Sequence, residues 1–269
     1  MNTKSHNYGR ELKSGILFVI FLSSLICISI SSSAWAKTYT TSFTATENPI
    51  SEHKKWINGG TVGLDWANVR TDGSKAYGTE SGTGGYDDST ALVTGNWKIN
   101  QTVQATVYNA VRGGTGSCQE VELRLRSTIT AHSNTGYEVL FSVNSSAQYI
   151  QIVKWLGPLG SFAYLPWEND DGVGANNYAH DGDIIKATIT GATSSDTTIT
   201  VYQNGVQIGH AVDNNVGGVS PWTSGNPGMG FYLQGAAGVN SDYGFTHFTA
   251  SDGVDTLPPS PPTNLHTLP

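Results

Sequence analysis

The stretch of sequence that decides the class of fold is Cys-Gln-Glu-Val-Glu-Leu-Arg-Leu-Arg, residues 118–126. From its first glutamate onward, charged and apolar residues alternate strictly. Because successive side chains of a β-strand point to opposite faces of a sheet, this period of two predicts a strand with one apolar and one charged face. The apolar residues are Val121, Leu123 and Leu125, and the charged residues are Glu120, Glu122, Arg124 and Arg126.

Short runs rich in Val, Ile, Thr, Tyr and Phe, broken by Gly, Asn, Asp and Ser, recur on both sides of this stretch. Such runs predict short strands, and no segment between Lys37 and Ser251 has the apolar period of an amphipathic helix. Many short strands separated by turn signals predict an all-β sandwich or jelly roll. We expect strands over Thr38–Phe43, Leu92–Thr94, Gln101–Tyr108, Glu120–Ser127, Gly136–Val143, Gln148–Trp155, Phe162–Pro166, Asp183–Thr190, Thr197–Gln203, Val206–Val212, Gly228–Gln234 and Tyr243–Thr249.

The clearest turn signal is Gln203-Asn204-Gly205-Val206, which lies between two of these runs. Asparagine and glycine accept the positive φ angles that both central residues of a type I′ turn require. The sequence therefore predicts a tight hairpin here, in which the strands before and after the turn are antiparallel neighbours.

Composition excludes several classes of protein. Of the 269 residues, 13% are charged and 10% are aromatic, whereas disordered chains combine many charges with few aromatic residues. A coiled coil would need abundant Ala, Glu, Lys and Leu. The formal net charge of −7 argues against a nucleic-acid partner, because such binding draws its affinity from Lys and Arg on phosphates.

Residues 1–36 are predicted to be a signal peptide. Three basic residues precede the apolar segment Gly15–Ile30, whose length is typical of a secretory signal and short for a membrane-spanning helix. Ala34 and Ala36 then form a cleavage site, with an uncleaved anchor as the alternative. We therefore expect a secreted or extracellular protein, with the periplasm or cell surface as alternatives, and no stable membrane anchor once the signal is removed. Its removal changes the formal charge from −7 to −9.

The C-terminal residues 253–269 differ from the rest in their proline content. Asp255–Pro262 holds four prolines, which cannot pair within a central strand, so the segment is interpreted as an extended linker. Asp255–Leu265 also resembles the linker and first residues of a fibronectin type III module, which would make the segment a truncated start of such a module. One folded domain is thus expected over residues 37–252.

Several segments together resemble the concanavalin A-like lectin/glucanase superfamily, of the laminin-G type. These segments are Lys55–Asp65, Glu120–Ser127, Thr198–Val212 and Asn226–Thr249. The resemblance implies an antiparallel β-sandwich of the concanavalin-like jelly-roll type, with sugars bound on the concave sheet or on loops at its rim. The expected function is that of an exported carbohydrate-binding, lectin-like domain whose partner is a polysaccharide or another glycan. A surface adhesion module is an alternative.

The charged face of residues 120–126 is the first candidate site, and it suggests a polysaccharide-degrading enzyme. Paired carboxylates such as Glu120 and Glu122 are the acid and nucleophile of glycoside hydrolysis. Laminarinase-like hydrolases carry a similar Glu-x-Asp-x-Glu strand, although Arg124 here replaces the last acid. Alginate-lyase-like jelly rolls carry a similar Arg-Ser-Glu-Leu-Arg strand, which implies a lyase that uses Arg124 with a tyrosine or His132, but the negative charge of the chain opposes a polyanionic substrate.

Interpretations without catalysis also fit these residues. The charged face is equally compatible with a solvated strand whose Glu and Arg residues pair with one another. His132, in the loop that follows the strand, is a candidate general base or sugar-binding group, or else a solvated loop histidine.

Arg126 and three aromatic residues are candidates for binding the glycan. Trp155, Tyr164 and Trp167 flank the Gly157-Pro158-Leu159-Gly160 turn and the loop after it. Aromatic rings stack on the apolar faces of pyranose rings, which suits a sugar-binding surface. Trp167 is the ring most expected at the surface, and the alternative for each ring is packing in the core or at a sheet edge.

Two loops rich in oxygen ligands are candidates for calcium. Glu168–Gly172 and His180–Asp183 both cluster carboxylates with glycine, which suits the six to eight oxygens that calcium takes. The candidate ligands are Asp170, Asp171, Asp181 and Asp183. Asp87-Asp88-Ser89 is a third cluster of this kind. The alternative is ordinary turn chemistry, in which Asp and Asn accept hydrogen bonds from nearby backbone.

Overall fold

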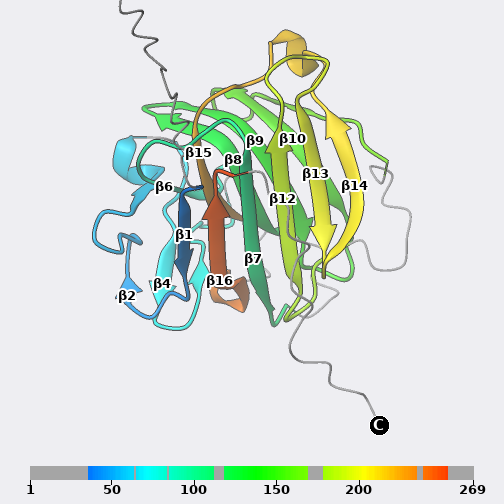
Figure 1. Cartoon of the computed structure of the whole chain (residues 1–269). Coiled ribbons are helices and arrows are strands. Elements are labelled where there is room, and N and C mark those ends of the chain that lie inside the picture. Colours follow the sequence, from blue (N-terminus) through cyan, green and yellow to red (C-terminus); the bar gives the residue numbers. More distant parts are fainter. Residues whose placement is uncertain are drawn as a thin grey trace, which may run out of the picture. The chain divides into compact units, whose positions relative to one another are not determined.

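The computed structural model describes residues 36–63, 65–83, 85–111, 118–168, 178–234 and 239–253. Within these ranges the chain forms two antiparallel sheets packed face to face (Figure 1). The antiparallel all-β sandwich expected from the sequence is therefore confirmed. The expected signal peptide up to Trp35 and the proline-rich tail beyond Gly253 lie outside the described residues.

The nine-stranded sheet carries the predicted hairpin at one edge. Asn204 and Gly205 have φ angles of 51° and 85°, as a type I′ turn requires, and β13 and β14 pair on either side of them. The strands, in the order in which they pair, are β14 (Val206–Val212), β13 (Thr198–Gln203), β12 (Ile184–Thr190), β7 (Gln101–Asn109), β16 (Tyr243–Ser251), β5 (Ala76–Tyr77), β4 (Arg70–Asp72) and β2 (Thr46–Glu47), with β1 (Thr38–Thr41) also paired to β16.

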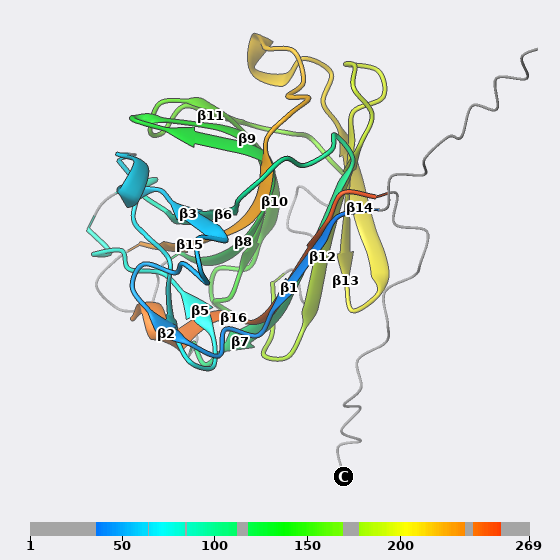
Figure 2. The same ribbon diagram turned by 60° about the vertical axis from the view of Figure 1, so that its left-hand side comes forward.

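The seven-stranded sheet forms the second layer, and Figure 2 shows both layers from the side. Its strands, again in pairing order, are β11 (Phe162–Tyr164), β10 (Ile150–Gly157), β9 (Ser133–Ser142), β8 (Gln119–Thr130), β15 (Asn226–Leu233), β6 (Ser89–Val93) and β3 (Trp56–Asn58). Strands β2 to β5 have two or three residues each and were not expected, because so short a run shows no period.

Short 3-10 helices are the helical elements of the described ranges, at Gly60–Val62, Val216–Gly218 and Asn240–Asp242. None of them has the length or apolarity that a membrane crossing requires.

The main core lies between the two sheets and contains the predicted apolar face of β8. Val121, Leu123 and Leu125 are fully buried there. They belong to the same cluster as the inward residues of the nine-stranded sheet, which include Val103, Ala105, Val107, Ile185, Ala187 and Ile189. A second, smaller apolar cluster covers part of the opposite face of the seven-stranded sheet, and it is made of Trp66, Leu92, Ile129, Leu140, Val153 and Trp155.

This second cluster changes the environment of the charged face of β8. Glu120 is 9% exposed, and Glu122 and Arg124 are 0% exposed. The expectation that this face is solvated is therefore wrong, because aromatic side chains cover it, whereas the expected pairing of its Glu and Arg residues is confirmed. The ring of Trp66 lies 5.2 Å from the Arg124 guanidinium, and that of Trp155 lies 5.9 Å from it.

Arg126 does not share this face, contrary to the period of two. The pairing of β8 with β9 shifts register between Leu125 and Thr128, and Arg126 has a φ of 46° at this bulge. Its guanidinium donates to the carbonyls of Ile99, Gly191 and Trp222, at 2.6, 2.7 and 2.9 Å. The bulge thus redirects a predicted sugar-binding side chain to the ends of neighbouring loops.

A glycine permits this bulge. Gly136 lies opposite it with a φ of 137°, and a Cβ there would approach the Ser127 Cα to 2.5 Å. A larger residue would therefore collide with the bulged backbone.

Candidate functional site

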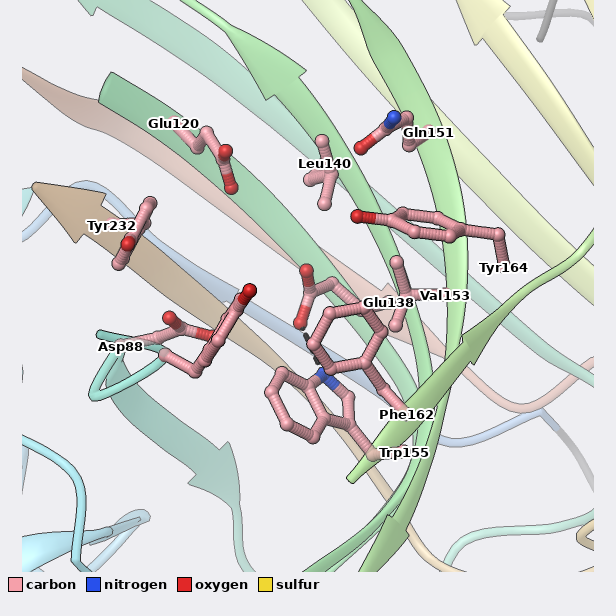
Figure 3. A pocket seen from close by; sticks show the side chains of 11 residues that line it. Asp88, Glu120, Glu138, Leu140, Gln151, Val153, Trp155, Phe162, Tyr164 and Tyr232 are labelled. Atoms are coloured by element: carbon pink, nitrogen blue, oxygen red, sulfur yellow. Dashed lines mark hydrogen bonds between the residues drawn. The ribbon is translucent and has the colours of Figure 1, made fainter. Parts of the chain in front are cut away.

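A cleft of about 360 Å³ lies on the outer face of the seven-stranded sheet. In Figure 3, Glu138 is at its centre, Asp88 and Glu120 lie to one side, and Phe162 and Tyr164 to the other. The lining residues are Tyr86, Asp88, Glu120, Glu138, Leu140, Gln151, Val153, Trp155, Phe162, Tyr164 and Tyr232. They come from β8, β9, β10, β11, β15 and the segment before β6.

Strand alternation explains why these side chains meet. On β9, Glu138 and Leu140 face the cleft, whereas their neighbours Tyr137, Val139 and Phe141 belong to the main core. The register places Arg124 of β8 opposite Glu138 of β9, and Glu138 opposite Val153 of β10. Residues at the same level of adjacent strands therefore share one face of the sheet.

Arg124 is the hub of a buried carboxylate cluster, which we define as Asp88, Glu120, Glu122 and Glu138. Its Nη2 lies 2.9 Å from Asp88 Oδ2 and 2.5 Å from Glu122 Oε2. Its Nη1 lies 2.8 Å from Glu138 Oε2. One guanidinium thus bridges carboxylates from β8, from β9 and from the segment before β6, and it ties the floor of the cleft together.

Four carboxyl groups share one cation in this cluster, and burial raises the pKa values of three of them. Burial away from water raises the pKa of Glu120 to about 8. Burial, together with the negative charge of Glu138, raises the pKa of Asp88 to about 7. Burial also raises the pKa of Glu122 well above its ordinary value, although Arg124 opposes this shift. At neutral pH part of the cluster therefore retains protons.

Glu138 is held in a defined orientation. Its Oε2 accepts a hydrogen bond of 2.6 Å from the Trp155 indole N–H as well as the contact from Arg124 (Figure 3). In the described part of the chain, no donor is bonded to its other oxygen. Glu120 is similarly fixed through Oε1, which accepts a hydrogen bond from the Tyr149 hydroxyl.

Aromatic rings form one wall of the cleft. Phe162 packs edge-on against Tyr86, Trp155 and Tyr164, with ring centroids 5.2, 5.0 and 5.4 Å apart. Tyr86 is 50% exposed and Tyr164 is 49% exposed, so both side chains are partly accessible to solvent beside the carboxylates. Tyr86 also has a φ of 65°, a left-handed conformation that costs a non-glycine residue roughly 1–3 kcal/mol and that often occurs at functional sites.

The structure brings several of the predicted site residues together. Glu120, Trp155 and Tyr164 line the cleft. Glu122 and Arg124 lie behind the lining, fully buried in their ion pair. The cleft is thus a joint feature of the charged strand and of the aromatic segment that follows it in the sequence.

Other predicted residues lie elsewhere. His132 is in the turn between β8 and β9, where its exposed ring contacts Asp65 at 2.8 Å, and it does not line the cleft. The expectation that Trp167 is exposed is wrong, because its ring belongs to the main core and is 8% exposed. Trp167 packs so closely over β14 that a Cβ at Gly209 would lie 2.7 Å from its ring.

The predicted calcium ligands divide into two pairs. Asp170 and Asp171 lie outside the described residues. Asp181 accepts a hydrogen bond of 2.9 Å from the Asn109 backbone N–H. The oxygens of Asp183 accept bonds from the side chains of Gln203 and Asn204 and from the His180 backbone. Asp181 and Asp183 thus act in turn chemistry in the described part of these loops.

A set of acidic residues outside these two loops is better arranged to hold a cation. Among the described residues, Asp88, Glu122 and Glu138 can each offer a carboxylate oxygen within 4.8 Å of the other two. Arg124 already supplies a positive charge to all three.

Sequence reasoning missed the role of Glu138 and of the aromatic residue Phe162. Glu138 is the one acid in its strand and lies between apolar residues, so the period of two that identified β8 could also have found it. The sequence identifies Asp88 only as part of an oxygen-rich cluster, because the residues around it do not indicate that it lies near β8.

No protein-family model matches this chain. No curated protein matches it.

Solved structures with a similar fold are distant in sequence. A β-porphyranase from the human gut bacterium Bacteroides plebeius is 10% identical, with a TM-score of 0.49, over 80% of this chain and 92% of that one. The carbohydrate recognition domain of Emp46p, in its metal-free form, is 10% identical, with a TM-score of 0.48, over 80% and 97%. A carbohydrate-binding module from Bacillus subtilis is 13% identical, with a TM-score of 0.44, over 76% and 95%. At these identities the similarity concerns the fold alone.

Proposed function

We propose that the cleft binds a unit of an extracellular polysaccharide and that the protein is an exported carbohydrate-binding, lectin-like domain. The observation that carries this proposal is the pairing of two half-exposed rings, Tyr86 and Tyr164, with carboxylates in one cleft. Such rings stack on the apolar faces of sugars, and carboxylate oxygens accept hydrogen bonds from sugar hydroxyls.

Export is part of the same proposal, and its support comes from the sequence. A basic start, an apolar segment and the Ala34-Trp35-Ala36 site are the pattern of a cleaved secretory signal. A polysaccharide partner outside the cell agrees with this destination.

Cleavage of the bound glycan is the second candidate function. Hydrolysis needs a carboxylic acid that keeps its proton at neutral pH beside an ionised carboxylate. The raised pKa of Asp88 suits the acid, and Glu138, oriented by Arg124 and Trp155, suits the role of the second carboxyl group. One carboxylate oxygen of each residue lies within 4.8 Å of the other, so the two groups are near enough to act on the same bond.

The residue pair expected from the sequence has less support for cleavage. Glu122 does not line the cleft, so Glu120 would have to act with a different carboxylate. Arg124, the cation that a lyase would use, is enclosed by its ion pairs. Hydrolysis is therefore better supported than elimination.

A panel of polysaccharides, scored at once for retention and for cleavage, tests the proposal. Retention without new products supports the binding domain, whereas new reducing ends support a hydrolase and an unsaturated product supports a lyase. Failure of every glycan to be retained or cleaved would contradict both functions and favour an adhesion module.

Two variants locate the binding surface. We expect Tyr164→Ala to weaken retention of a bound polysaccharide, because it removes an exposed ring of the cleft. Tyr202→Ala is the matched control, since this tyrosine lies in β13 of the other sheet. Equal losses in both variants, or a loss only in Tyr202→Ala, would place the sugar elsewhere.

We also propose that the loops 168–172 and 180–183 bind calcium, because both contain several carboxylate side chains. An ion there would have to replace the hydrogen bonds that Asp183 now accepts. A ligand bound only to the folded state raises the melting temperature, so EDTA should lower it if calcium is present. An unchanged melting curve in saturating EDTA would exclude the ion.

A further inference from the structure

The floor of the cleft carries more negative groups than positive ones. Within the described ranges, Arg124 is the cation whose ion pairs reach the carboxylate cluster, and it contacts Asp88, Glu122 and Glu138. Glu120 belongs to the same floor and pairs with the Tyr149 hydroxyl, a neutral group. One guanidinium thus serves four carboxyl groups, and protons retained on part of the cluster supply positive charge that a bound cation would replace.

The carboxylate oxygens of this cluster that accept no side-chain hydrogen bond indicate where a positively charged ligand would bind. Asp88, Glu120 and Glu138 all line the cleft. Each of them receives side-chain donors on one oxygen, and no side chain of the described residues donates to the other.

Glu122, which lies behind the lining of the cleft, also has an oxygen without a donor in the described part of the chain. Its side chain is 0% exposed, yet its Oε1 has no hydrogen-bond partner among the described residues. Buried carboxylate oxygens normally have a donor, and an orphan atom of this kind calls for a ligand or another explanation. The orphan belongs to the group whose oxygens lie within 4.8 Å of Asp88 and Glu138.

The aromatic wall has the second property that a cationic group requires. Tyr86, Phe162 and Tyr164 form a continuous set of rings beside the carboxylates. The faces of aromatic rings attract ammonium groups, and sites that hold such groups combine rings with acidic residues.

We infer that the cleft takes a sugar unit that carries a protonated amino group, as in a de-N-acetylated hexosamine polymer. An ammonium group has three N–H donors, which matches the three lining carboxylates. A uronic acid would meet like charges, and a neutral sugar would bring no positive charge to the carboxyl groups. This inference rests on the proposed glycan-binding function and specifies its ligand.

Calorimetric titration with two matched trisaccharides tests the inference. The probes are the glucosamine trimer and the N-acetylglucosamine trimer, which have the same rings and linkages and differ in charge. We expect the glucosamine trimer to bind about tenfold tighter or more, the size of a charge-assisted hydrogen bond that the neutral probe lacks. Added salt should weaken the charged probe alone.

A pair of variants assigns the preference to the cleft. Glu120→Gln keeps an acceptor for Tyr149 but removes a lining carboxyl, so the preference for the charged trimer should fall while the neutral trimer is little affected. Asp72→Asn is the control, because this carboxylate lies in β4 of the other sheet, away from the cleft. It should leave the preference unchanged.

Loss of the amino-sugar preference and loss of all glycan binding would give different results. Equal affinity for the two trimers, or an equal effect of Glu120→Gln on both, overturns the amino-sugar inference while leaving glycan binding intact. Binding of calcium alone that disappears in Glu120→Gln would assign the missing charge to a metal ion and also overturn it. If neither trimer nor any glycan of the wider panel binds, both the inference and the proposed function fail.

Discussion

Arg124 of β8 and Glu138 of β9 lie directly opposite each other, with the guanidinium Nη1 2.8 Å from Glu138 Oε2. The same guanidinium reaches Asp88, which is 36 residues away in the sequence. This cross-strand pair fixes both the shape of the cleft and the charge at its floor.

Removing the hub should destabilise the fold strongly. Arg124→Gln leaves buried carboxylates without their cation, and breaking a buried pair by removing one partner costs about 3–5 kcal/mol. Urea unfolding of the variant measures this loss. Lys75→Gln is the control, since the Lys75–Asp72 pair is partly exposed and such pairs are worth about 0–1 kcal/mol. Similar losses in the two variants would contradict the hub role.

Stability should fall as the pH rises through neutrality. The pKa of Glu120 is raised to about 8 and that of Asp88 to about 7, both far above their values in an unfolded chain. Between about pH 4 and those values the folded state binds more protons than the unfolded state, so the free energy of unfolding decreases with increasing pH.

Melting temperatures measured from pH 5 to pH 9 test this dependence. We expect a steady decline that levels off above the raised pKa values. Glu120→Gln should reduce the slope, whereas Asp72→Asn, in β4 of the other sheet, should preserve it, because a lowered pKa keeps that carboxyl ionised throughout this range. A flat profile in the unmodified protein would show that the cluster is ionised throughout.

A glycine under the ion pair should not tolerate a side chain. A Cβ at Gly230 of β15 would overlap Glu122 Oε2 and lie 3.0 Å from the Nε of Arg124. Gly230→Ala should therefore destabilise the protein by about 1–3 kcal/mol through overpacking. Gly85→Ala is the control, because a Cβ there meets no atom within 4 Å. Equal melting temperatures for the two variants would refute the close packing.

Secreted material should begin at Lys37. The Ala34-Trp35-Ala36 site predicts cleavage after Ala36, and the Lys37 backbone nitrogen already donates a hydrogen bond of 2.6 Å to Asp252 Oδ1. Cleavage would convert that nitrogen into a charged partner of the same carboxylate. N-terminal sequencing of protein from the medium is the measurement, and retention of residues 1–36 would disprove the cleavage site.

The sequence by itself determined the class of fold and the inward face of its central strand. The alternation over residues 118–126 identified Val121, Leu123 and Leu125 as core, and Asn204-Gly205 identified a hairpin. Both signals are local, because the period of a strand and the backbone angles of a turn depend on a few consecutive residues.

The tertiary structure alone decided which residues form the site. Asp88 reaches Arg124 because β6 pairs with β15 and β15 pairs with β8, and no local pattern encodes that order. Arg126 leaves the charged face at a bulge that Gly136, on the neighbouring strand, makes room for. Burial by Trp66 and Trp155 converts a charged strand face into a cluster that retains protons. Strand order, register and desolvation arise from contacts between distant segments, so a period read along one strand cannot contain them.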